Sequence, residues 1–119
     1  LPFIWYHRFL SLDEALKRTR APFMPANALT IFGFPEEHYY VLCTATPCEA
    51  LPIRHRLLED PTERVAFTSL GTMMRTGFEW YLQGAVQADG SGWLTEDIYA
   101  VADIHSDWNP GSTFPFAVP

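Results

Sequence analysis

The spacing of apolar positions predicts a strand and then a helix at the start of the chain. Residues 3–10, FIWYHRFL, are aromatic and β-branched, which is typical of a strand. The following segment, SLDEALKRTR, begins with Ser11 and Glu14, three residues apart, as in a capping box. Its apolar residues recur at helical spacing, so a helix is predicted over about 12–20.

The next segments read as strands separated by turns. LTIFGF (29–34) and HYYVLCTAT (38–46) are rich in aromatic and β-branched residues and flank a Pro-Glu-Glu turn. ALPIRHRL (50–57) is a candidate third strand. Pro52 has no backbone N–H to give to a neighbour, which favours an edge position for that strand.

A second helix start is predicted in EDPTERVAF. Asp60 is suited to the N-cap, Pro61 to the first helical position, and Glu63 completes a capping box. Apolar residues then follow at helical spacing, which predicts a helix over 61 to about 75, with Gly77 as its end. The apolar residues of this helix, Phe67, Leu70, Met73 and Met74, are expected in the core.

Beyond Gly77 the apolar positions alternate with period two. This predicts a β-hairpin of residues 78–87 with 93–106 around the turn ADGSG, followed by a proline-rich apolar tail over 109–119. The order of elements predicts a single α+β domain over 1–119. We expect two layers, with a mainly antiparallel sheet of five to six strands covered by two helices and ending in a C-terminal β-hairpin.

Charge is distributed unevenly along the chain. All eight Lys and Arg lie between Arg8 and Arg75, and six of the 14 acidic residues follow Thr76, where there is no base. The net charge of −6 argues against nucleic-acid binding, which depends on phosphate neutralisation. Apolar runs are too short to span a membrane. The acidic last third is either a solvated surface or a face for a cationic partner.

The segment DIHSD carries the strongest candidate chemistry. On a strand, Asp103, His105 and Asp107 would share one face, where His105 could act as a general base between two carboxylates. The two aspartates would stand roughly 13 Å apart, so the three residues could not hold one metal ion on a straight strand. A metal site would need His105 with Asp103 and a distant ligand such as His38. The simpler interpretation is the polar outer face of a strand.

Cys43 and Cys48 flank a Thr-Pro turn. In an oxidising compartment we expect a disulfide between them, and in a reducing one two thiols. Zinc binding would need His38 and His55 as further ligands, at a spacing that matches no standard finger.

Several aromatic and basic residues are candidates for binding, because Tyr and Trp are enriched in interfaces and arginine grips carboxylates and phosphates. They are Trp80, Tyr81, Trp93, Tyr99, Trp108, Arg54 and Arg56. For the two arginines, internal ion pairing is the competing interpretation.

These observations predict a small acidic, non-enzymatic interaction module that acts as a homo-oligomer or with a protein partner, and a cationic ligand is an option. The alternative is a small-ligand or metal-dependent enzyme that uses Asp103, His105 and Asp107. No cofactor is expected, because no Gly-rich phosphate loop or nucleophile motif occurs.

Overall fold

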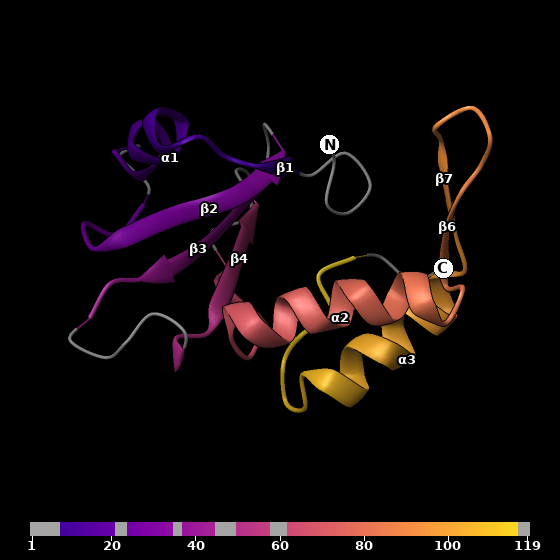
Figure 1. Cartoon of the computed structure of the whole chain (residues 1–119). Coiled ribbons are helices and arrows are strands. Elements are labelled where there is room, and N and C mark those ends of the chain that lie inside the picture. The colour runs from indigo at the N-terminus through magenta and orange to yellow at the C-terminus, as the bar shows by residue number, and fades with distance from the viewer. Residues whose placement is uncertain (1–7, 21–23, 35–36, 45–49, 58–61, 117–119) are drawn as a thin grey trace.

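The computed structural model of the chain describes residues 8–20, 24–34, 37–44, 50–57 and 62–116. It is an α+β fold with an antiparallel sheet, a separate two-stranded ribbon and three helices (Figure 1). The predicted fold class and the antiparallel character of the sheet are therefore confirmed. The number of strands, the number of helices and the extent of the hairpin differ from the prediction.

The main sheet is a meander in which each strand pairs antiparallel with the next. Its body consists of β2 (Ala28–Phe34), β3 (Glu37–Leu42), β4 (Ile53–Leu57) and β5 (Arg64–Phe67), and the two-residue strand β1 (Arg8–Phe9) adds beside β2. The strands predicted at 29–34 and 38–46 are confirmed as β2 and β3, although β3 ends at Leu42. Residues 3–7 of the first predicted strand lie outside the described residues.

The prediction that Pro52 places its strand at an edge is wrong. The strand β4 lies between β3 and β5. Pro52 comes before the first residue of β4, so its missing N–H removes no bond from either ladder.

The helix α1 (Leu12–Thr19) confirms the first predicted helix. Ser11 is its N-cap, and the Ser11 hydroxyl accepts a hydrogen bond from the backbone N–H of Glu14 at 3.2 Å. Acidic residues lie in its first turn and basic residues in its last, as the helix dipole favours. The helix packs against β2.

The helix predicted over 61–75 is wrong. Residues 64–67 form β5, and the helix α2 begins only at Leu70 and continues to Leu82. Its capping box is formed by Ser69 and Thr72, and Gly77 lies inside the helix. The expected cap at Asp60 and Pro61 falls outside the described residues.

The hairpin predicted over 78–87 and 93–106 is also largely wrong. Only β6 (Val86–Ala88) and β7 (Leu94–Glu96) pair as strands. Residues 98–108 form the helix α3 (Ile98–Trp108), whose N-cap Asp97 accepts from the backbone N–H of Tyr99 and Ala100. The short hairpin projects at the far end of α2, away from the main sheet (Figure 1).

The core lies between one face of the main sheet and the pair α2 and α3. The indole N–H of Trp80 on α2 donates to the backbone carbonyl of Val101 on α3 at 2.9 Å, which ties the two helices together. The buried core side chains from both layers are Phe32, Tyr39, Val41, Ile53, Ala66, Phe67, Met73, Trp80, Val101 and Ile104. Leu70 and Met74, which were expected in this core, are exposed instead.

The outer edge of β5 is bonded to the C-terminal part of the chain. The backbone N–H of Thr113 donates to the carbonyl of Val65 at 2.8 Å, and the His105 ring bonds the carbonyl of Ala66 through Nε2. The side-chain oxygen of Asn109 accepts from the backbone N–H of Thr68. The tail therefore lies along its own domain as far as Phe116, and residues 117–119 lie outside the described residues.

Candidate interaction surface

The outward side of α2 carries a row of exposed apolar side chains, which we call the α2 ridge. Its members are Leu70, Met74, Phe78 and Leu82, exposed by 36, 46, 55 and 64%, and Tyr81 lies beside them at 43%. A solvent-facing helix normally carries polar residues on this side. The ridge was not predicted from the sequence, because Leu70 and Met74 were expected in the core. The spacing of four residues between successive ridge members was the signal that could have revealed it.

Arg75 borders the ridge and is held by its neighbours. Its guanidinium pairs with the Glu79 carboxylate at 2.5 Å and lies 4.9 Å from the ring centroid of Trp108 and 5.3 Å from that of Phe78. Glu79, which is buried, also accepts from the Gln83 amide at 2.8 Å. The charge of Arg75 is therefore compensated locally, and it links the ridge to the end of α3.

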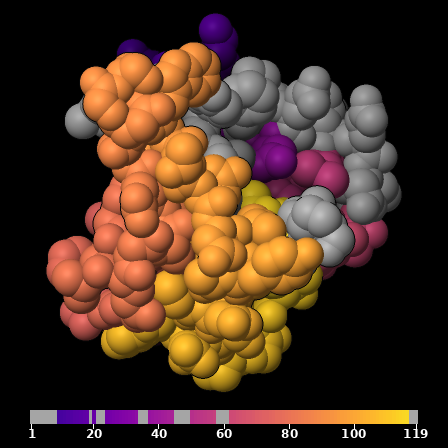
Figure 2. Space-filling model, turned by 90° about the vertical axis from the view of Figure 1, so that its right-hand side faces the viewer, coloured from indigo at the N-terminus to yellow at the C-terminus, as the bar shows by residue number. Residues whose placement is uncertain are grey.

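The β6–β7 hairpin stands above the end of α2 (Figure 2) and has an ordered loop. The Asp89 carboxylate accepts from the hydroxyl and the backbone N–H of Ser91 and from the backbone N–H of Trp93. These bonds, with that to the Ser91 hydroxyl the strongest, lower the pKa of Asp89. They fix the loop that presents Trp93, whose side chain is 60% exposed.

Acidic residues surround the far end of α2. Glu96 pairs with Val86 in the hairpin, and the backbone N–H of Asp97 donates to the carbonyl of Ala85 at 2.8 Å, so both acids lie close behind the last turn of the helix. That turn contains no basic residue. The opposite half charges of the α2 C-terminus and of the α3 N-terminus, which Asp97 caps, offset each other here, so it is the two carboxylates that make this end of the molecule electronegative.

The DIHSD segment is helical, so the prediction that its three side chains share the face of a strand is wrong. Residues two apart on a helix are separated by about 200° around its axis. Asp103 and Asp107 point to solvent, whereas His105 is 1% exposed and packs between the rings of Phe67 and Phe114. The structure therefore does not bring the two carboxylates to the imidazole.

The environment of His105 is apolar. Burial lowers its pKa, and the bond to the Ala66 carbonyl opposes that effect only in part. In this bond Nε2 carries the proton, because a carbonyl oxygen can only accept. The arrangement fits a neutral histidine that joins α3, β5 and the tail.

His38, the distant ligand of the proposed metal site, lies on β3 of the main sheet, whereas His105 and Asp103 lie on α3. The described residues include no group of three or more His, Cys, Asp or Glu side chains placed to hold a metal ion. Burial lowers the pKa of His38, and the nearby charges of Arg18 and Arg56 lower it further.

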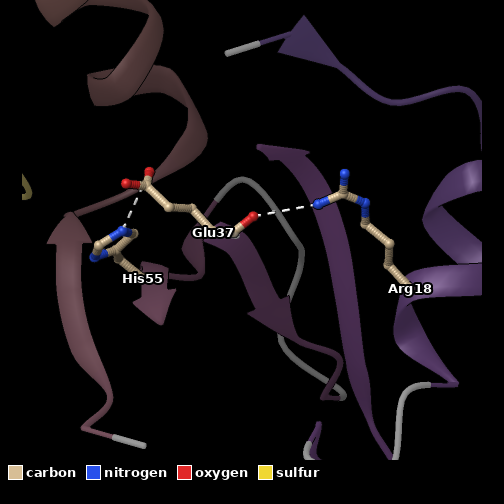
Figure 3. A network of polar contacts seen from close by, with 3 residues as sticks. All are labelled: Arg18, Glu37 and His55. Carbon is tan, nitrogen blue, oxygen red and sulfur yellow. Dashed lines mark hydrogen bonds and ion pairs between the residues drawn. The ribbon is translucent and has the colours of Figure 1, made fainter. Parts of the chain in front are cut away.

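A polar network inside the sheet was not anticipated from the sequence. The Glu37 carboxylate lies 3.6 Å from Nε2 of His55, and the Arg18 guanidinium donates to the Glu37 backbone carbonyl at 3.2 Å (Figure 3). Tyr39 stacks between Phe32 and His55, and burial, followed by the charge of Glu37, raises its pKa. His55 and Tyr39 are buried, and the network joins β3, β4 and α1.

The remaining predicted binding residues divide into buried and exposed groups. Trp80 is 1% exposed and belongs to the core, whereas Tyr81, Trp93, Tyr99 and Trp108 are exposed on the helices and hairpin. Arg54 pairs with Glu63 at 3.3 Å, and Arg56 lies half-buried on β4.

Cys43 is an exposed free thiol immediately after β3. Cys48, its predicted disulfide partner, lies outside the described residues.

Comparisons with known proteins return no relative. No family model, no curated protein and no solved structure matches the chain. None of the helices in the described part of the chain combines the length and apolar character that crossing a bilayer requires.

Proposed function

We propose that the protein is a non-enzymatic interaction module whose contact surface is the α2 ridge with the neighbouring hairpin and acidic residues. One observation carries the proposal: four exposed apolar side chains follow one another along one side of α2, with the Arg75 guanidinium at their border beside Phe78. Exposed apolar patches of this kind, rimmed by polar residues, mark protein contacts. Exposed aromatic residues such as Phe78, Tyr81 and Trp93 are the types that dominate binding energy.

The alternative function, an enzyme that uses Asp103, His105 and Asp107, has less support. A general base must reach its substrate, and a nucleophile or metal must lie within bonding distance of it. His105 is buried among aromatic rings, and its accessible neighbours point away from it. The surface of the helices is therefore the better candidate.

The test compares two substitutions of the same kind at different places. Met74→Ser with Phe78→Ser removes the centre of the ridge, whereas Leu16→Ser removes another apolar side chain, 40% exposed, from α1. Analytical ultracentrifugation reports self-association, and quantitative capture from the source organism reports other partners. We expect association to be lost with the ridge variant and kept with Leu16→Ser. Equal association by all three proteins would refute the proposal.

A further inference from the structure

The α2 ridge has the geometry of a helix-packing surface. Leu70, Met74, Phe78 and Leu82 are each four residues apart, so they form one of the ridges that a second helix packs beside. At a rise of about 1.5 Å per residue the ridge is about 18 Å long, which matches roughly three turns of a partner helix.

The surface beside the ridge is open to a partner. Gly71 begins the adjacent row of residues on α2, and a Cβ at this position would meet only the Ser69 hydroxyl, at 3.8 Å. The missing side chain leaves room beside Leu70, whereas Arg75 and Glu79 continue the same row further along α2. A partner helix can therefore approach α2 most closely at the Leu70 end of the ridge.

Charge distinguishes between the possible occupants. Leu82, the most exposed member of the ridge, lies in the last turn of α2, and the backbone N–H of Asp97 donates to the carbonyl of Ala85 three residues further on, so Glu96 and Asp97 lie next to this end of the ridge. Two copies of the chain, each with a net charge of −6, repel one another, and a parallel pair would also bring two acidic ends together. Arg75, the one Lys or Arg after Arg64, is already paired with Glu79. A cationic partner is attracted to the same surface.

We infer that the α2 ridge binds an amphipathic helix of a protein partner that carries lysine or arginine beside its apolar face. This inference rests on the proposed function, because it names the partner of the same surface. The apolar side of the partner helix lies along the ridge, and its basic residues lie toward Glu96 and Asp97.

The experiment uses three synthetic peptides as probes against the full chain. One consists of leucine and lysine with leucine at helical spacing, and is about 18 residues long so that it can form a helix. The second has glutamate in place of lysine. The third has the same leucine and lysine content as the first, but its leucines are not at helical spacing. Fluorescence anisotropy gives the affinities, and backbone amide shifts from ¹⁵N spectra locate the contact.

Three variants accompany the probes. Phe78→Ser is expected to weaken binding of the leucine–lysine peptide by at least about tenfold, as loss of a central aromatic contact does. Glu96→Gln with Asp97→Asn, which keeps an N-cap side chain on α3, is expected to weaken it about fivefold at low salt and not at about 1 M salt. The control, Asp13→Asn with Glu14→Gln on α1, removes the same charge elsewhere and should change the affinity less than about twofold.

Support requires that only the leucine–lysine peptide binds, with shifts along α2. Equal binding of the glutamate peptide would overturn the cationic partner, and equal binding of the scrambled peptide would overturn the helical one. Failure of all probes would also overturn the inference, yet the proposed function would stand if the ridge variant described above still abolishes association. Shifts confined to other surfaces, with association unchanged in that variant, would reject both.

Discussion

The sheet half of the molecule, residues 8–67, and the helical half, residues 68–116, differ in their balance of charge. The sheet half holds seven Lys and Arg and eight Asp and Glu, whereas the helical half holds Arg75 and six acids. Arg75 pairs with Glu79, so Glu96, Asp103 and Asp107 face solvent with no further Lys or Arg in that half to compensate them. This uncompensated charge near the α2 ridge is the difference on which the proposed contact surface rests.

Two tryptophans of the helical half, Trp80 and Trp93, should differ most in their effect on stability. Trp80→Ala removes a buried side chain and its bond to the Val101 carbonyl, and we expect it to lower the free energy of unfolding by about 3–5 kcal/mol. Trp93→Ala, on the exposed hairpin, should cost about 1 kcal/mol or less. Urea unfolding measures both. Similar losses would show that Trp93 belongs to the core and not to the contact surface.

Substitution of a glycine by alanine should have opposite effects on stability in the two halves, at Gly33 and at Gly71. A Cβ at Gly33 would lie 2.5 Å from the Glu37 carbonyl oxygen, across the β2–β3 turn, so Gly33→Ala should cost on the order of 1–3 kcal/mol. At Gly71 on α2 a Cβ would make only an ordinary contact with the Ser69 hydroxyl at 3.8 Å, so Gly71→Ala should gain up to about 1 kcal/mol from helix propensity. Thermal unfolding of both variants decides this, and a gain at position 33 would contradict the β2–β3 geometry.

The two histidines whose pKa is lowered, His38 in the sheet half and His105 in the helical half, predict loss of stability in acid. The folded protein favours their neutral forms, so the unfolded chain binds more protons once the pH falls below the ordinary value of 6.5. Stability should therefore fall below about pH 6.5, by up to about 1.4 kcal/mol per pH unit for each histidine.

His105→Gln keeps a donor for the Ala66 carbonyl but removes the titratable imidazole of His105. His38→Gln likewise removes the titratable imidazole of His38. Each should flatten the decline in the urea midpoint between about pH 7 and about pH 5. An unchanged slope in both variants would show that other groups cause the acid sensitivity.

The smallest expected changes in the free energy of unfolding come from two aspartates, Asp107 at the C-terminal end of α3 and Asp13 at the N-terminal end of α1. Asp107 lies in the last turn of α3, four residues after Asp103, where the helix dipole and the like charge both disfavour it. Asp107→Asn should stabilise the protein by about 0.5 kcal/mol at low salt. Asp13→Asn, in the first turn of α1, should destabilise it by a similar amount. Chemical unfolding at two salt concentrations tests this, and effects of the same sign would contradict the dipole argument.

The sheet half was largely predictable because its signals are local. The capping box of α1 and the aromatic runs of β2 and β3 each identify their own element. The later predictions failed where two signals competed. Asp60, Pro61 and Glu63 resemble a helix start, but the cap that forms is that of Ser69 and Thr72.

The candidate surface could be predicted only in part, because α3 reads as a strand. Ile98, Val101 and Ile104 favour strands by propensity, and the alanines between them fit either period. The spacing of Val101, Ile104 and His105, which are buried together, is helical. Exposed Tyr81, Trp93 and Tyr99 were identified as binding candidates from the sequence. The ridge was not, because tertiary packing decides which side of α2 faces the core.

The bonding at β5 has a consequence for how copies of this protein could polymerise. A sheet grows indefinitely only if its last strand offers a regular series of backbone groups to an incoming chain. At β5 two of these groups, the carbonyls of Val65 and Ala66, already bond the tail amide of Thr113 and the ring of His105, and the N–H of Thr68, just after the strand, bonds the Asn109 side chain. None of these three partners belongs to a strand, so another copy of the chain could add to β5 only by displacing them. The bonds that hold the tail in place thus also protect this strand from edge-to-edge aggregation.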